Sequence, residues 1–236
     1  RQDVCLEDVL RRLRNHPGYL DFLAMEAIQR SLVWVFAPNW RDLLSILAAP
    51  VTDVTAAFKL VQNVRAPTKR DLFEASLTRS LHNYLASSMS LTDHAKVVLG
   101  TCNEEISAEF GRRGKELSDL PVVKFMRFLR NFTMHEMQPW FGHTLSMERI
   151  RVDSPEMSAT YRTTLSTAEL LGSRKISGRA RSFVAESGSE VVLNEVIALH
   201  GQLISGFCYA LVGALRDAAS VAQHGLHGLL VEANMV

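Results

Sequence analysis

Residues 121–138 have the sequence PVVKFMRFLRNFTMHEMQ, the clearest helical pattern in the chain. On a helical wheel, aromatic and aliphatic side chains fill most of the circumference. The polar side chains fall in one arc of about 140°, here named the polar arc: Lys124, Arg127, Arg130, Asn131 and His135. Val123 and Met134 intrude on this arc. The pattern predicts a helix that packs through an aromatic face and presents a polar cluster, stopped before Pro139.

Helical spacing continues on both sides of this segment. Apolar residues recur at intervals of three and four over residues 69–85 and again over 91–110. Thr92 or Asp93 could cap a second helix there, or one helix could run through. We expect Gly111 and Gly114 to end it. The longest helix is predicted over residues 190–216, where Gly201, Gly206 and Gly213 would permit close helix contact.

The first fifty residues also favour helices. A short amphipathic helix is predicted over residues 6–13 and stopped by Pro17 and Gly18. Residues 19–28 can be helical, and a short helix is expected around residues 40–47, between Pro38 and Pro50. Residues 32–36, LVWVF, fit either a buried strand or a helix end. A further helix is predicted over residues 51–61.

Two stretches between the predicted helices alternate loosely in polarity. Residues 144–151 and 159–165, joined by a turn-forming segment at 153–156, predict a small β-hairpin. Residues 167–171 fit a helical turn, and 172–177 fit a loop. The expected fold class is therefore mainly α, a helical bundle with a small β-hairpin before the last long helix. The predicted organisation is an N-terminal helical extension over 1–50, a bundle over 51–220 and a tail over 221–236.

Composition narrows the class of protein. The chain has 236 residues, 47% of them hydrophobic, enough for one core or two small ones. A net charge of +1 gives no general attraction to nucleic acid or membranes, so any RNA would meet a local basic patch. The apolar runs at 32–37 and 207–211 are too short to span a bilayer, and no leader pattern opens the chain. We therefore expect a cytoplasmic protein without membrane association.

The cysteines do not form a metal or disulfide pattern. Cys5, Cys102 and Cys208 are about a hundred residues apart with no C-x-x-C, so we expect reduced thiols, no metal ion and no cofactor. His224 and His227 with Glu232 are better explained as exposed residues of a tail than as metal ligands.

Arg130 and His135 suit phosphate chemistry. An arginine holds a phosphate through its planar fork, and a histidine moves a proton near neutral pH. At a helix C-terminus the protonated imidazole is favoured, which suits a general acid. Arg11 and His16 repeat the spacing, but no polar arc accompanies them, and we interpret them as surface residues. A solvated basic face ending in a histidine cap is the alternative interpretation of the polar arc.

The spacing of Arg130, Asn131 and His135 resembles the R-x(4–6)-H signature of HEPN domains, in which a polar residue often follows the arginine. The segments RSLHNYLASS (79–88) and SLTDH (90–94) are similar to the helix pair that precedes this motif in a bacterial HEPN-like group. The resemblance covers roughly residues 51–218.

The resemblance implies an all-α bundle that pairs as a homodimer and cleaves RNA without a metal. Arg130 would then bind the scissile phosphate, His135 would act as general acid or base, and Asn131 would orient them. Arg127 and Lys124, outside the signature, are added as substrate-binding residues because they share the polar arc. The implied setting is phage defence or a toxin–antitoxin system, with an antitoxin or another protein as a further partner. The rival hypothesis is a non-catalytic module that binds a protein or a nucleotide through the same polar groove.

Overall fold

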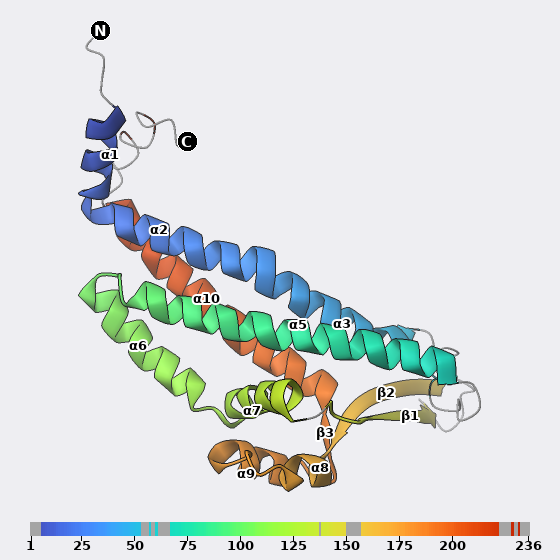
Figure 1. Cartoon of the computed structure of the whole chain (residues 1–236). Helices are drawn as coiled ribbons and strands as arrows, with labels where there is room; N and C mark the ends of the chain where they lie inside the picture. Colours follow the sequence, from blue (N-terminus) through green and yellow to red (C-terminus); the bar gives the residue numbers. More distant parts are fainter. Residues whose placement is uncertain are drawn as a thin grey trace. The chain divides into compact units, whose positions relative to one another are not determined.

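The computed structural model confirms a mainly helical fold with a small β-structure (Figure 1). It describes residues 6–52, 57, 60, 67–136, 138–149, 157–221, 228 and 231. The helices are α1 (Leu6–Arg14), α2 (Pro17–Arg30), the π-helix η1 (Ser31–Phe36), α3 (Ala37–Thr52), α5 (Pro67–Leu99), α6 (Glu104–Ser118), α7 (Pro121–His135), α8 (Thr167–Gly172), α9 (Gly178–Glu186) and α10 (Leu193–Val221). The strands are β1 (Phe141–Arg149), β2 (Met157–Ser166) and β3 (Glu190–Val192).

The chain divides into two compact units. Unit 1 comprises Arg1–Val35, Ser90–Glu116 and Ile204–Val236, and unit 2 comprises Phe36–Met89 and Leu117–Leu203. The domain boundaries predicted near residues 50 and 220 remain predictions. Most of the helix predicted over residues 51–61 lies outside the described residues, as do Cys5, His224, His227 and Glu232.

In unit 1, α6 continues through both glycines that were expected to end it, so that expectation was wrong. Asn103 accepts a hydrogen bond from the Ile106 N–H (3.0 Å) at the start of the helix. Two ion pairs at i,i+4 spacing then accompany the glycine positions: Glu109–Arg113 (3.3 Å) and Arg112–Glu116 (2.6 Å). A Cβ added at Gly114 would come within 3.4 Å of the Phe207 ring, so the glycine allows a close helix approach.

The segment 32–36, left open between strand and helix, is the π-helix η1. Leu32 and Phe36 are buried, whereas Val33, Trp34 and Val35 are exposed.

The choice between one helix and two around residues 92 and 93 is settled by the structure. A single helix, α5, runs through residues 90–93 and ends at Leu99. The helix predicted around residues 40–47 is longer at both ends, because Pro38 lies in the first turn of α3 and Pro50 is accommodated inside it.

In unit 2, aromatic side chains of α3 and α5 pack against the first half of α10. The Trp40 Nε1–H donates to the Ile197 carbonyl (3.2 Å), and the Phe36 and Trp40 rings stack at 6.0 Å between centroids. A Cβ at Gly201 would overlap the Trp40 indole, which confirms that this glycine permits close packing. Gly206 and Gly213 have no atom within 4 Å of an added Cβ, so they do not serve that purpose.

His200 lies in this core. Its Nδ1 is 2.6 Å from the Tyr84 hydroxyl, and only 4% of the residue is exposed. Burial lowers the pKa of His200 from 6.5 to about 4. The neutral imidazole is therefore the form that the folded protein holds.

This burial predicts a loss of stability in mild acid. The unfolded chain takes up the His200 proton near pH 6.5, whereas the folded chain resists until about pH 4. The contribution of neutral His200 to the free energy of unfolding is therefore complete above pH 6.5. It falls by about 3 kcal/mol between pH 6.5 and 4, at about 1.4 kcal/mol per pKa unit. Urea unfolding of the wild type and of His200→Gln across this range should show a steeper decline for the wild type. Parallel declines would contradict the assignment.

The predicted hairpin is confirmed, and a third strand joins it. β1 pairs antiparallel with β2, from Phe141 opposite Leu165 to Arg149 opposite Met157. β3 pairs with the end of β2, with Thr164 opposite Val192. The longest helix therefore begins at Leu193, because residues 190–192 complete the sheet instead. α9, between residues 178 and 186, was also not predicted.

A half-buried chain of polar side chains fastens the hairpin to α5. His143 Nε2 is 3.2 Å from Glu74 Oε1, and His143 Nδ1 is 2.7 Å from the Tyr161 hydroxyl. Arg70 holds the same glutamate at 2.7 Å. Burial lowers the pKa of His143, although the hydrogen bond that its ring donates to Glu74 opposes the shift. Tyr161 is 3% exposed, so we assign this chain to packing rather than to catalysis.

Among the helices of the described residues, one meets the length and composition expected of a membrane span. Residues Leu193–Ser220 of α10 have a mean hydropathy of 1.5, and 44% of that stretch is buried. This is weak evidence for a membrane protein, because the core helix of a soluble protein passes the same test. The sequence interpretation considered only the shorter apolar runs and did not identify this stretch.

Candidate functional site

The site is built on α7, which starts and ends where the sequence predicts. Pro121 occupies the first turn, where its missing N–H costs nothing. Glu136 follows the last residue, His135, and its N–H donates to the Phe132 carbonyl (3.0 Å). The predicted aromatic face is buried, and Phe125 packs against Phe183 of α9 at 5.1 Å between ring centroids. The buried side chains are Val122, Val123, Phe125, Met126, Phe128, Leu129, Phe132 and Thr133.

Two arginines of the polar arc have no acidic partner among the described residues. Arg127 and Arg130 are half-buried, and the Nε atom of each is buried without a hydrogen-bond acceptor in that part of the chain. Arg130 donates from one terminal nitrogen to Asn131 Oδ1 (3.2 Å). Asn131 therefore orients the arginine, and the guanidinium charges on this helix face are left without a counter-ion in the described structure.

The remaining members of the polar arc are placed differently. His135 is exposed at the last position of α7, three residues beyond the buried Phe132. Lys124 pairs with Asp119 (3.0 Å), so its charge is already balanced inside the protein. Val123 is buried despite its place in the polar arc, so the exposed part of the arc is narrower than the wheel predicts.

The other copy of the motif has structural partners, in line with the interpretation of its residues as non-catalytic. Arg11 forms an ion pair with Asp8 on the exposed side of α1. His16 caps α2, where its Nδ1 accepts a hydrogen bond from the Gly18 N–H (3.2 Å). His94 is 2.7 Å from the Ser31 hydroxyl within unit 1, and Asp93 pairs with Lys96. None of these residues belongs to the unit that contains α7.

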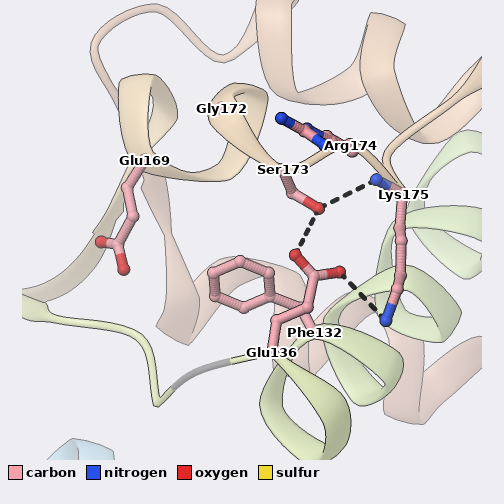
Figure 2. Close-up of a pocket in the computed structure, with 7 residues that line it drawn as sticks. All are labelled: Phe132, Glu136, Glu169, Gly172, Ser173, Arg174 and Lys175. Atoms are coloured by element: carbon pink, nitrogen blue, oxygen red, sulfur yellow. Dashed lines mark hydrogen bonds and ion pairs between the residues drawn. The ribbon is translucent and has the colours of Figure 1, made fainter.

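A cavity of about 360 Å³ lies at the C-terminal end of α7. Figure 2 shows Phe132 and Glu136 on one side of it, with Glu169 of α8 and the segment 172–175 around them. There the Glu136 carboxylate accepts a hydrogen bond from the Ser173 hydroxyl (2.8 Å) and pairs with Lys175 Nζ (3.7 Å). No member of the polar arc lines this cavity, although His135 immediately precedes Glu136. Sequence reasoning missed it, because most of its lining follows α7 by more than thirty residues.

Four other potential nucleophiles of the described residues, two cysteines and two serines, are held in unreactive states. Burial raises the pKa of the Cys208 thiol to about 12, and burial together with the nearby Asp21 raises that of Cys102 to about 11. The buried hydroxyls of Ser87 and Ser88 donate to backbone carbonyls of their own helix, those of Tyr84 (3.0 Å) and Leu85 (2.9 Å). Within the residues that the structure describes, no group of three or more His, Cys, Asp or Glu side chains could hold a metal ion.

Comparison with protein-family models, with curated proteins and with solved structures found no match for this chain. The function must therefore be argued from α7 and its surroundings.

Proposed function

We propose that the polar arc of α7 is the active site of a metal-independent endoribonuclease of the HEPN type. The observation that carries the proposal is the state of three side chains on one helix. Arg127 and Arg130 lack an acidic partner among the described residues, and His135 is exposed at the helix end. A phosphate is the group that arginine forks of this kind bind best.

The chemistry follows from these residue types. Arg130, oriented by Asn131, binds the scissile phosphate and stabilises the charge that develops on it. The ribose 2′-OH attacks phosphorus while the bond to the 5′-oxygen breaks. His135 removes the 2′-OH proton or supplies the proton to the departing 5′-oxygen. The products are a 2′,3′-cyclic phosphate on one fragment and a 5′-hydroxyl on the other. Arg127 extends the cationic surface along the strand, whereas Lys124 contributes less because Asp119 pairs with it.

The setting that fits this activity is the cytoplasm, in phage defence or a toxin–antitoxin system, with a protein partner that restrains the enzyme. The rival is a non-catalytic module that binds a protein or a nucleotide through the same helix face.

The proposal is tested by incubating the purified protein with mixed RNA in the presence of EDTA. Histidine and arginine chemistry needs no metal, so we expect cleavage to persist at its full rate. Cleavage that requires added Mg²⁺ or Mn²⁺ would point to another mechanism. RNA binding without cleavage under any of these conditions would favour the rival module.

The proposal includes a homodimer whose two-fold axis lies beside the polar arc. One protomer offers a single Arg130 and a single His135. A second protomer would place two of each along the phosphate backbone of one RNA strand. Phe128 is buried in the protomer and is not available to the interface. Met134 is available, since it is 38% exposed between Thr133 and His135.

Met134→Asp is therefore expected to weaken the dimer without unfolding the bundle, because a charge would be desolvated at the interface. Light scattering should show a wild-type dimer and a shift of the variant toward monomer, with the cleavage rate falling in parallel. Met147→Asp is the matched control, because Met147 is also exposed but lies on β1. A monomeric wild type that still cleaves RNA would refute the shared site.

A further inference from the structure

The most exposed of the large hydrophobic side chains that the structure describes is Trp140, at 78%. It follows His135 by five residues, between the buried Pro139 and Phe141. Its neighbours fix the backbone, so the indole is presented to solvent from a held position. An exposed indole offers a large apolar ring with a polar N–H, the kind of side chain that is enriched at binding surfaces.

The backbone of Trp140 is tied to the cavity beside α7. Glu169, which lines the cavity, accepts a hydrogen bond from the Trp140 backbone. The Oε1 atom of Glu169 is buried and has no hydrogen-bond partner among the described residues. Burial raises the pKa of this carboxyl group, whereas the Trp140 hydrogen bond lowers it. Trp140 and His135 are five residues apart, the cavity lining includes Glu136 and Glu169, and all of these residues belong to unit 2.

The cavity has the size and the chemistry for a flat heteroaromatic group. Its volume of about 360 Å³ is at the lower end of the range for small-ligand pockets, about 300–1,000 Å³. Figure 2 shows the Phe132 ring between the carboxylates of Glu136 and Glu169. Arg174, on the same rim, is exposed and forms no ion pair with the residues that the structure describes. The apolar ring of Phe132, the carboxylate oxygens as hydrogen-bond acceptors and the Arg174 cation together suit a nucleobase and its phosphate.

We propose that Trp140 and the adjoining cavity form a subsite for an unpaired nucleobase of single-stranded RNA. This inference rests on the proposed function, because it requires that the RNA strand bound across the polar arc continues past His135. Trp140 stacks on one base, which every base allows through its π-face, and the cavity beside Glu169 receives the edge of a base. The subsite binds the strand and takes no part in proton transfer.

The test uses a fluorescently labelled, single-stranded 2′-O-methyl oligonucleotide, which binds but lacks the free 2′-OH needed for cleavage. Loss of one stacking interaction corresponds to an increase in Kd of about 5- to 150-fold, which we expect for Trp140→Ala by fluorescence anisotropy. Trp140→Phe should recover part of the affinity, since a ring remains. Trp34→Ala is the matched control, because Trp34 is 68% exposed but belongs to unit 1, and its Kd should equal that of the wild type.

An unchanged Kd for Trp140→Ala, or no binding of the oligonucleotide by the wild type, would overturn the subsite. So would a Trp140→Ala protein that is monomeric where the wild type is dimeric, since the indole would then serve the contact between copies. Cleavage distinguishes this inference from the proposed function. If the wild type cleaves RNA and Trp140→Ala cleaves it with the same KM, the subsite is refuted and the proposed nuclease is not. Trp140-dependent binding without any cleavage supports the subsite and refutes the nuclease.

Discussion

Replacing His135 with alanine is expected to lower the rate of RNA cleavage by at least about 10²-fold, the usual scale for a lost general acid or base. His135 is exposed at the last position of α7, so the substitution removes the proton-transfer group without opening the core. The free energy of unfolding should therefore change little. The measurement is a single-turnover cleavage rate for both proteins, with thermal unfolding as the check on the fold.

His16→Ala is the matched control for this variant. His16 belongs to the other Arg-x₄-His copy, but it caps α2 and lies in unit 1. Loss of that cap should cost stability of about 1 kcal/mol and leave the cleavage rate unchanged. Equal losses of activity in the two variants would mean that His135 has no special role in the reaction.

Arg130→Lys is expected to impair cleavage severely although the positive charge remains. A lysine ammonium is a point charge that cannot reproduce the bidentate fork on a phosphate. It also cannot preserve the planar contact with Asn131 Oδ1, so the charge would lose its orientation. We expect a loss of one to several orders of magnitude in kcat/KM, on the order of 10–10³-fold for a lost electrostatic stabiliser.

Arg11→Lys serves as the control for the arginine, because Arg11 is exposed and pairs only with Asp8 among the described residues. That variant should cleave at the wild-type rate. Full activity of Arg130→Lys would show that the fork geometry is not needed, and the phosphate-binding role of Arg130 would have to be abandoned.

The helix that carries the site was largely predictable from its own sequence. The apolar spacing over residues 121–135 identified the buried face of α7, and Pro121 and Pro139 bounded it. The alternation before and after residues 153–156 identified the hairpin, because one of its faces packs on the core. Both patterns are local, so they can be seen without knowing the partners.

Most of the errors come from contacts between distant parts of the chain. Gly111 and Gly114 are an exception in part: the ion pairs that accompany α6 past them are local, at i,i+4 spacing, whereas the Phe207 ring that Gly114 accommodates comes from α10. Residues 190–192 look helical by spacing but complete the sheet by pairing with β2. The cavity was invisible for the same reason, since Glu169 and residues 172–175 meet the end of α7 only in the folded chain. Val123 and Lys124 show that a wheel cannot reveal which polar positions a neighbouring element covers or neutralises.

The measurement that tests the central claim most directly is the chemistry of the RNA ends. Mixed RNA is incubated in EDTA with the wild type and with His135→Ala, and the 3′ ends of the fragments are analysed. Attack by the 2′-OH, assisted by Arg130 and His135, predicts 2′,3′-cyclic phosphate ends from the wild type and almost none from the variant. Wild-type fragments that end in a free 3′-hydroxyl, or equal cleavage by both proteins, would contradict the account.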